Sequence, residues 1–240
     1  LAIDEVSQLG VTAVIAAGND GYNINNMNEG KGTIGSPATA RQAITVGAST
    51  KADRIADFSS AGPVFGDNFG LVKPDVVAPG EDICAAQYKN WLDYYRCIDD
   101  QHIAISGTSM AAPHVAGVVA LIKQKNPDWT PQEIKMSLRN GAININSKLL
   151  VQGHGRIDAL NSFLQSKPPI AEIITGGDEI SGTIDIIGTA TGDSYTLYYG
   201  EGVYPSEWVE IGSGTRVNDG VLVNWDIENI KLKISGSNIR

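Results

Sequence analysis

The hydrophobic pattern of the chain changes at about residue 167. Before that point, short apolar runs alternate with loops rich in Gly, Asn and Ser; the runs are 11–18, 43–49, 75–79 and 103–106. Such runs predict strands buried on both faces of a parallel sheet. Beyond Pro169, apolar and polar residues alternate in five segments, at 183–190, 194–200, 208–212, 221–225 and 230–235. That alternation, with turn residues between the segments, predicts a small antiparallel β-sandwich.

Helices are expected between and after the apolar runs of the first part, at 2–9, 108–125, 130–139 and 156–164. The segment 108–125 begins with small and apolar residues on every side, which predicts a helix buried in the core. Thr130-Pro131-Gln132-Glu133 combines an N-cap Thr, a first-turn Pro and a Glu three residues after the cap. Residues 84–101 form a polar, aromatic excursion, which predicts a hairpin or a loop insertion.

Composition changes at the same place as the pattern. Lys167-Pro168-Pro169 is a stiff, linker-like break, and residues 168–240 hold 4 basic and 11 acidic residues. We therefore expect two domains, an α/β domain over 1–167 and a small β-sandwich-like accessory domain over 168–240. The last strand stops abruptly at Arg240, which suggests that the second domain is incomplete. The net charge of −9 argues against nucleic acids and anionic membranes as partners.

Ser109 is the first residue with candidate chemistry. The stretch "AISGTSMAAPHVAG", residues 104–117, runs from a predicted strand through Gly-Thr-Ser into a predicted helix. The N-terminus of a helix carries a partial positive charge and unpaired N–H groups, which would stabilise an oxyanion beside this hydroxyl. The alternative is a structural role, in which Thr108 or Ser109 only caps the helix.

Several blocks in the first part resemble, in the family's order, those of the subtilisin-like serine proteases, the subtilases. They are "VTAVIAAGNDG" (11–21), "FSSAG" (58–62) with "KPDVVAPG" (73–80), "GTSMAAPHVAG" (107–117) and "GHGRIDALNS" (153–162). The resemblance covers roughly residues 1–165. It implies part of the subtilisin-like parallel-sheet fold, a serine endopeptidase activity on protein or peptide substrates, and secretion.

The resemblance also implies roles for single residues. Ser109 resembles the nucleophile that forms the acyl-enzyme, and its backbone N–H would be one donor to the oxyanion. Asn19 resembles the residue whose side chain donates to the oxyanion. The alternative is that Asn19-Asp20-Gly21 only forms a turn. Ala16, Ala17 and Gly18 resemble one wall of the pocket for the substrate residue that precedes the scissile bond.

The residues that would activate Ser109 are not found. Subtilases supply their triad in the order Asp, His, Ser, and neither a D-[ST]-G nor an H-G-T-H block occurs in the chain. His114 follows Ser109 on the same predicted helix and is not expected to reach it, and His102 and His154 are interpreted as surface or loop residues. We therefore expect a C-terminal portion of a catalytic domain, inactive unless the N-terminal part ahead of Leu1 is its partner.

Cysteines and acidic residues add two further expectations. Cys84 and Cys97 would form a disulfide in a secreted protein and remain two thiols in cytosol; we favour the disulfide. No cofactor is needed for the chemistry, and no Cys/His cluster suggests zinc. The resemblance allows structural calcium, with the Asp-rich stretches 99–100 and 178–179 as candidates, but no spaced calcium loop is present and no metal ligand is named.

Two other functions compete with the protease. Gly107-Thr-Ser-Met-Ala111 is similar to the nucleophile elbow of an α/β-hydrolase esterase, with Asp128 and His154 following in the required order. The chain could instead be a non-catalytic pseudo-protease or a binding fragment, in which the aromatic residues of 168–240 line a ligand face. At their period-two spacing, cross-strand packing is the more common role for such aromatics.

Overall fold

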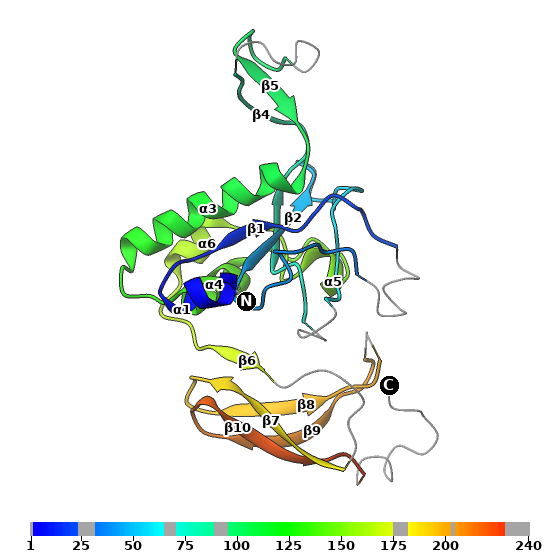
Figure 1. Cartoon of the computed structure of the whole chain (residues 1–240), viewed down its shortest axis with the longest axis vertical. Coiled ribbons are helices and arrows are strands. Elements are labelled where there is room, and N and C mark those ends of the chain that lie inside the picture. The colour runs from blue at the N-terminus through cyan, green and yellow to red at the C-terminus, as the bar shows by residue number, and fades with distance from the viewer. Residues whose placement is uncertain are drawn as a thin grey trace. The chain divides into compact units, whose positions relative to one another are not determined.

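The computed structural model describes residues 2–23, 32–64, 71–88, 96–174, 182–202 and 205–228. The chain divides into two compact units, residues 1–168 and 169–240, which are described separately (Figure 1). The division falls after Pro168, and the sequence places it after Lys167. Among the described residues, no helix is long and apolar enough to cross a membrane.

Unit 1 contains a three-stranded parallel sheet. Its strands are β1 (Val14–Ala16), β2 (Ile44–Ser49) and β3 (Val76–Pro79), in the order β1-β2-β3. All six residues of β2 are buried, as expected for a strand with neighbours on both sides and both faces covered. Three of the four predicted apolar runs therefore form the parallel sheet, and the mixed α/β class is confirmed for this unit.

The fourth run does not join that sheet. Residues His102–Ile105 form β5, which pairs antiparallel with β4 (Ile83–Ala86) in a separate two-stranded sheet. Ile103 is buried, and the other three residues of β5 are only half-buried. A four-residue apolar run does not by its pattern distinguish a parallel from an antiparallel sheet, so the sequence could not assign this strand. We call residues 83–105 the arm; it projects from the rest of unit 1 in Figure 1. The predicted excursion at 84–101 is its middle, of which 89–95 lie outside the described residues.

The described part of unit 1 also contains the helices α1 (Ala2–Gln8), α3 (Thr108–Lys125), α4 (Pro131–Gly141), α5 (Leu149–Gln152) and α6 (Ala159–Leu164). The start of α4 is the capping box that the sequence predicts. The Thr130 hydroxyl accepts from the Glu133 N–H at 3.3 Å, and the Thr130 N–H donates to the Glu133 carboxylate at 2.8 Å. The short helix α5 has no counterpart in the predicted elements.

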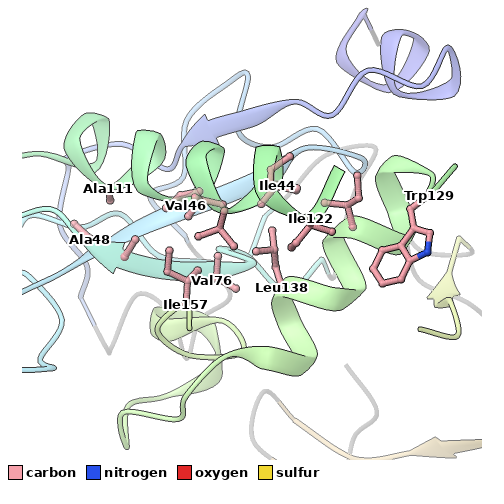
Figure 2. Packing of buried hydrophobic residues seen from close by; sticks show 14 of the residues in the cluster. Ile44, Val46, Ala48, Val76, Ala111, Ile122, Trp129, Leu138 and Ile157 are labelled. Carbon is pink, nitrogen blue, oxygen red and sulfur yellow. The ribbon is translucent and has the colours of Figure 1, made fainter. Parts of the chain in front are cut away.

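The core of unit 1 lies between α3 and the sheet, with α4 closing one end (Figure 2). Ile122 of α3 and Val46 and Val76 of the sheet, labelled in Figure 2, belong to one cluster with Val115 of α3, and all four are fully buried. The opposite side of α3 is exposed, and Leu121 keeps 49% of its surface accessible. The prediction of a helix buried in the core is therefore confirmed for one face of α3 and wrong for the other, which has no partner among the described residues.

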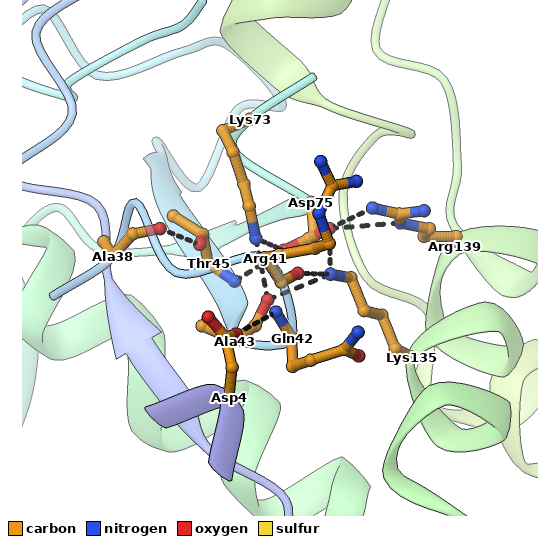
Figure 3. A network of polar contacts seen from close by, with 10 residues as sticks. All are labelled: Asp4, Ala38, Arg41, Gln42, Ala43, Thr45, Lys73, Asp75, Lys135 and Arg139. Atoms are coloured by element: carbon orange, nitrogen blue, oxygen red, sulfur yellow. Dashed lines mark hydrogen bonds and ion pairs between the residues drawn. The ribbon is translucent and has the colours of Figure 1, made fainter. Parts of the chain in front are cut away.

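A buried ionic network joins the sheet to α4 (Figure 3). The Asp75 carboxylate, 1% exposed, accepts from the Thr45 N–H at 2.7 Å and from Lys73 Nζ at 2.8 Å. Arg139 reaches the same carboxylate with Nε at 3.1 Å and with Nη2, and Lys135 Nζ lies 3.3 Å away. Burial raises the pKa of Asp75, but the charges of the three cations outweigh it and hold that pKa well below its usual range.

The same cations fix the backbone beside β2. Lys73 Nζ donates to the Ala43 carbonyl at 2.7 Å, and Lys135 Nζ donates to the carbonyls of Arg41 and Ala43 at 2.7 and 3.1 Å. Each ammonium therefore has both a carboxylate and carbonyl partners, which offsets the cost of burying its charge.

Unit 2 is entirely antiparallel in its described part. One sheet has the order β10-β7-β6, formed by Val217–Asp226, Thr183–Ala190 and Ala171–Ile173; β8 (Tyr195–Tyr199) pairs with β9 (Val209–Gly214) in a second. Tyr199 and Trp225 join the two sheets with ring centroids 5.2 Å apart. Four predicted strands are found at these positions, β6 was not predicted, and the segment 230–235 lies outside the described residues.

Candidate active site

Ser109 is the second residue of α3 and is exposed to solvent. Gly107 occupies the N-cap position and has no side chain to cap the helix, and the Thr108 hydroxyl is bonded outside the helix. The capping alternative is therefore not realised. Among the described residues, none hydrogen-bonds the Ser109 hydroxyl, so it is available to a substrate.

Thr108 holds Asn19 in one orientation. The Thr108 N–H and hydroxyl both lie within hydrogen-bond distance of Asn19 Oδ1, at 2.9 and 3.0 Å. Because an N–H can only donate, the atom that faces it must be the amide oxygen, and the Nδ2 group is turned away from Thr108. The Thr108 hydroxyl also accepts from the Gly18 N–H at 3.2 Å, so one buried side chain positions two consecutive residues.

Gly107 leaves an open point between two N–H donors. A Cβ built on Gly107 would lie 3.3 Å from Asn19 Nδ2 and 3.7 Å from the Ser109 backbone nitrogen. The absence of a side chain at Gly107 therefore leaves room beside the Asn19 amide and the Ser109 N–H together. Two preorganised donors around one open point are what stabilise the oxyanion of a tetrahedral intermediate.

Ser60 fixes the segment that carries Asn19 from the other side. The Ser60 N–H donates to the Gly18 carbonyl at 3.0 Å, and the Asp20 N–H donates to the Ser60 hydroxyl at 3.1 Å. Gly18 has φ +115°, and a Cβ there would lie 2.8 Å from Ser60 Oγ, so only glycine allows this approach. The sequence marks "FSSAG" as a family block without a role, and the structure shows that it holds both neighbours of Asn19.

The three residues predicted to line a substrate pocket differ in exposure. Ala17 is 1% exposed, so its side chain belongs to the core, whereas Ala16 and Gly18 are half-buried. The Ala17 carbonyl accepts from the Gly35 N–H at 3.3 Å, and a Cβ on Gly35 would meet nothing within 4 Å. The pocket role of Ala16, Ala17 and Gly18 stays a prediction.

No described residue acts as a base for Ser109. The His114 ring is bonded to the Met110 carbonyl, one turn earlier in its own helix, at 2.8 Å. His102 lies on the arm with Nδ1 2.6 Å from Asp99, and this bond lowers the pKa of the Asp99 carboxyl. His154 sits beside the Asp75 network, where partial burial and the Arg139 charge lower its pKa.

The described residues hold no cluster of metal-binding side chains and no free cysteine. Among residues 2–23, 32–64, 71–88, 96–174, 182–202 and 205–228, no group of three or more His, Cys, Asp or Glu could hold a metal ion. The candidate stretch 178–179 lies outside these ranges, so the calcium expectation stays a prediction. The arm carries a disulfide between Cys84 and Cys97, whose Cα atoms are 6.0 Å apart.

A serine at a helix N-terminus, with a fixed amide beside its own N–H, is the arrangement of a serine hydrolase that uses an oxyanion hole. The chain belongs to the Subtilase family, whose model matches residues 2–158. This membership excludes the α/β-hydrolase alternative. The backbone N–H of His154 donates to the Asp75 carbonyl at 3.0 Å, which places this histidine beside the Asp75 network.

Individual relatives agree with the family. Serine protease AprX of Bacillus subtilis is 37% identical over 173 residues, which are 67% of this chain and 37% of the relative. Subtilisin Savinase of Lederbergia lenta is 35% identical over 158 residues, 66% of this chain and 48% of the relative. The chain thus spans between about a third and a half of these relatives.

The fold is also found in a solved structure. Fervidolysin from Fervidobacterium pennivorans, described as a keratinolytic enzyme related to subtilisin, matches with a TM-score of 0.53. The match covers 85% of this chain and 27% of fervidolysin, at 24% identity. At that identity the match supports the fold alone.

Proposed function

We propose that this chain carries the nucleophile and the oxyanion hole of a subtilisin-like serine endopeptidase. In this proposal the Ser109 oxygen attacks the carbonyl carbon of a peptide bond, and the Asn19 amide and the Ser109 N–H hold the resulting oxyanion. The amine then leaves with a proton, and water releases the acyl group from Ser109. The observation that carries the proposal is the open point beside Gly107, which both donors border.

We further propose that the general base and its orienting carboxylate come from polypeptide outside these 240 residues. The rings of His102 and His114 are bonded to Asp99 and to the Met110 carbonyl, and His154 lies beside the Asp75 network. Unit 1 also presents surface that further chain could cover. The exposed side of α3 includes the small and apolar Ala116, Gly117, Ala120 and Leu121, and among the described residues β1 has a strand on one side only. An unpaired strand edge is normally covered or blunted in a folded protein.

The disulfide supports a secreted protease. Disulfides persist in oxidising compartments, and Cys84 and Cys97 are bonded to each other. Peptides and proteins are the substrates that the family implies, and a hydroxyl without a base is a poor nucleophile at neutral pH. The isolated chain should therefore hydrolyse casein no faster than its Ser109→Ala variant.

The decisive test is chemical labelling of Ser109. The sequence encoded ahead of Leu1 should contain an Asp block and a His block in that order, and the protein that includes them should react with a fluorophosphonate at Ser109. Ser109→Ala should abolish both labelling and casein hydrolysis, whereas the exposed Ser166→Ala should change neither. Failure of the longer protein to label would instead favour the pseudo-protease. Labelling of the isolated chain that depends on His154 would overturn the assignment of the base.

A further inference from the structure

One edge of β4 in the arm has no partner strand among the described residues. In the part of the chain that the structure describes, β4 pairs with β5 and with no other strand. Gln87 and Gln101 continue this ladder, with the Gln87 N–H donating to the Gln101 carbonyl at 2.8 Å. Hydrogen-bonded pairs alternate along an antiparallel ladder, so Ala85 and Ile83 also point their backbone groups toward β5.

It follows that Cys84 and Ala86 point their N–H and C=O groups away from β5. A bond on the far side of β5 supports this alternation. The His102 carbonyl, which lies opposite Ala86, accepts from the Cys97 N–H at 3.4 Å. A carbonyl in that bond cannot also be directed at β4. The outer edge of β4 therefore displays two backbone donors and two acceptors, flanked by the small side chains of Ala85 and Ala86.

The base of the arm is fastened to the candidate active site. The Gly107 N–H donates to the Gly80 carbonyl at 2.8 Å, and the Asp82 N–H donates to the Ser106 hydroxyl at 3.0 Å. β5 ends at Ile105, four residues before Ser109. The edge of β4 thus starts beside the nucleophile and runs outward from it.

The arm is held in shape without help from the core. A two-stranded hairpin is at best marginally stable by itself, and both residues at the end of β4 are exposed. The Cys84–Cys97 disulfide closes the arm across 13 positions of sequence. This hairpin adds little to the core, so the disulfide is not needed to hold the core together. It has a clear purpose if the outer edge of β4 must keep a defined shape.

We propose that the outer edge of β4 binds an extended segment of the polypeptide substrate as an added strand, so that the arm is an exosite next to Ser109. The inference rests on the proposed function, since it takes a protein substrate as the occupant. An extended polypeptide matches the free groups of Cys84 and Ala86 because it repeats the same donor and acceptor spacing. Side-chain identity then matters little, and unfolded or locally unfolded proteins are the preferred class.

Binding can be measured without catalysis. The probe is fluorescein-labelled ribonuclease A, reduced and carbamidomethylated so that it stays unfolded, and the protein is the full 240-residue chain with Ser109→Ala. Fluorescence anisotropy reports the affinity. Ala86→Pro removes the outward N–H, whereas Ala86→Thr adds a side chain at the same position and keeps that N–H. We expect Ala86→Pro to bind at least tenfold more weakly than Ala86→Thr, and the latter to stay within twofold of its parent.

Hydrogen exchange on the parent chain gives a readout that needs no variant. The probe should slow amide exchange in residues 83–87 and leave α4 unchanged. Equal affinities for the two Ala86 variants, absence of probe binding, or unchanged exchange in 83–87 would each overturn the exosite. These outcomes are independent of Ser109 labelling: an exosite that binds beside a serine that never reacts would contradict the proposed function alone.

Discussion

The Asp75 network and the Ser109 site lie in the same unit and use their polar groups in opposite ways. Around Asp75 the groups are charged and buried, and each cation is bonded to the carboxylate or to a backbone carbonyl. Asn19 and Ser109 are neutral and exposed, and the Asn19 Nδ2 group and the Ser109 hydroxyl have no partner among the described residues. Polar groups whose bonds are all made within the protein stabilise the fold. Donors that are held in place without a partner can instead bind the charge that develops in a transition state. Breaking each region should therefore change a different quantity.

The largest effect on stability is expected from Asp75→Asn. Removing the carboxylate leaves three cations without their shared counter-charge, and breaking one partner of a buried ion pair costs about 3–5 kcal/mol of unfolding free energy. Urea denaturation of the chain measures the loss. Asp53→Asn is the control, since Asp53 is 50% exposed in its pair with Arg156 and should cost less than about 1 kcal/mol. Equal losses in the two variants would contradict the contrast between buried and surface charge.

Acid should reduce that difference. The folded pKa of Asp75 lies below its unfolded value, so its stabilisation is complete above the ordinary carboxyl range and is lost as the pH falls below about 4. The unfolding free energies of the wild type and Asp75→Asn should converge as the pH drops from 5 toward 2. A difference that stays constant over this range would show that Asp75 is not the charged centre of the network.

At the other region, Asn19→Ala should change catalysis and leave stability nearly intact. In the complete protease, meaning this chain together with the segment that supplies the base, loss of one oxyanion donor lowers kcat by about 10²–10³. The free energy of unfolding should fall by only about 1 kcal/mol, because Asn19 is exposed and contributes no core packing, so that only its bonds to Thr108 are lost. Steady-state kinetics and urea denaturation separate the two. Asn140→Ala, an exposed asparagine on α4, should leave kcat unchanged.

The same contrast separates what the sequence predicts from what it does not. Three parallel strands, α3 and the capping box of α4 follow from local patterns, and Ser109 and Asn19 follow from family blocks. Thr108 and Ser60 could not be found in this way, because their bonds are long-range. Thr108 is bonded to Gly18 and Asn19, about 90 positions away. Ser60 is bonded to Gly18 and Asp20, about 40 positions away. The exposed side of α3 does not follow from the sequence. Small and apolar residues show that a helix face can be buried, but they do not show whether another segment covers that face.

The Asp75 network has a weak signal in the sequence, which lies in the spacing of two cations. Lys135 and Arg139 lie four residues apart on α4, beside the buried Ile134 and Leu138. Two cations at a helical spacing next to core positions indicate a buried counter-charge, since an unpaired buried charge is costly. "KPDVVAPG" contains that counter-charge, but only the fold brings residue 75 to α4.

Gly107→Ala tests whether the open point beside Asn19 is used in the reaction. The backbone of Gly107 is extended, with φ 160°, so alanine does not strain the backbone. Its Cβ would lie 3.3 Å from Asn19 Nδ2, 3.6 Å from Met110 Sδ and 3.7 Å from the Ser109 nitrogen. The methyl group would crowd the oxyanion position without removing either donor, and displacement of about 1 Å costs up to ~10²-fold in rate. We expect kcat of the complete protease to fall about 10- to 100-fold, less than for Asn19→Ala, with urea stability unchanged. Gly192→Ala in unit 2, which makes only ordinary contacts, should change neither quantity. If Gly107→Ala keeps full activity, the oxyanion is bound somewhere other than between Asn19 Nδ2 and the Ser109 N–H.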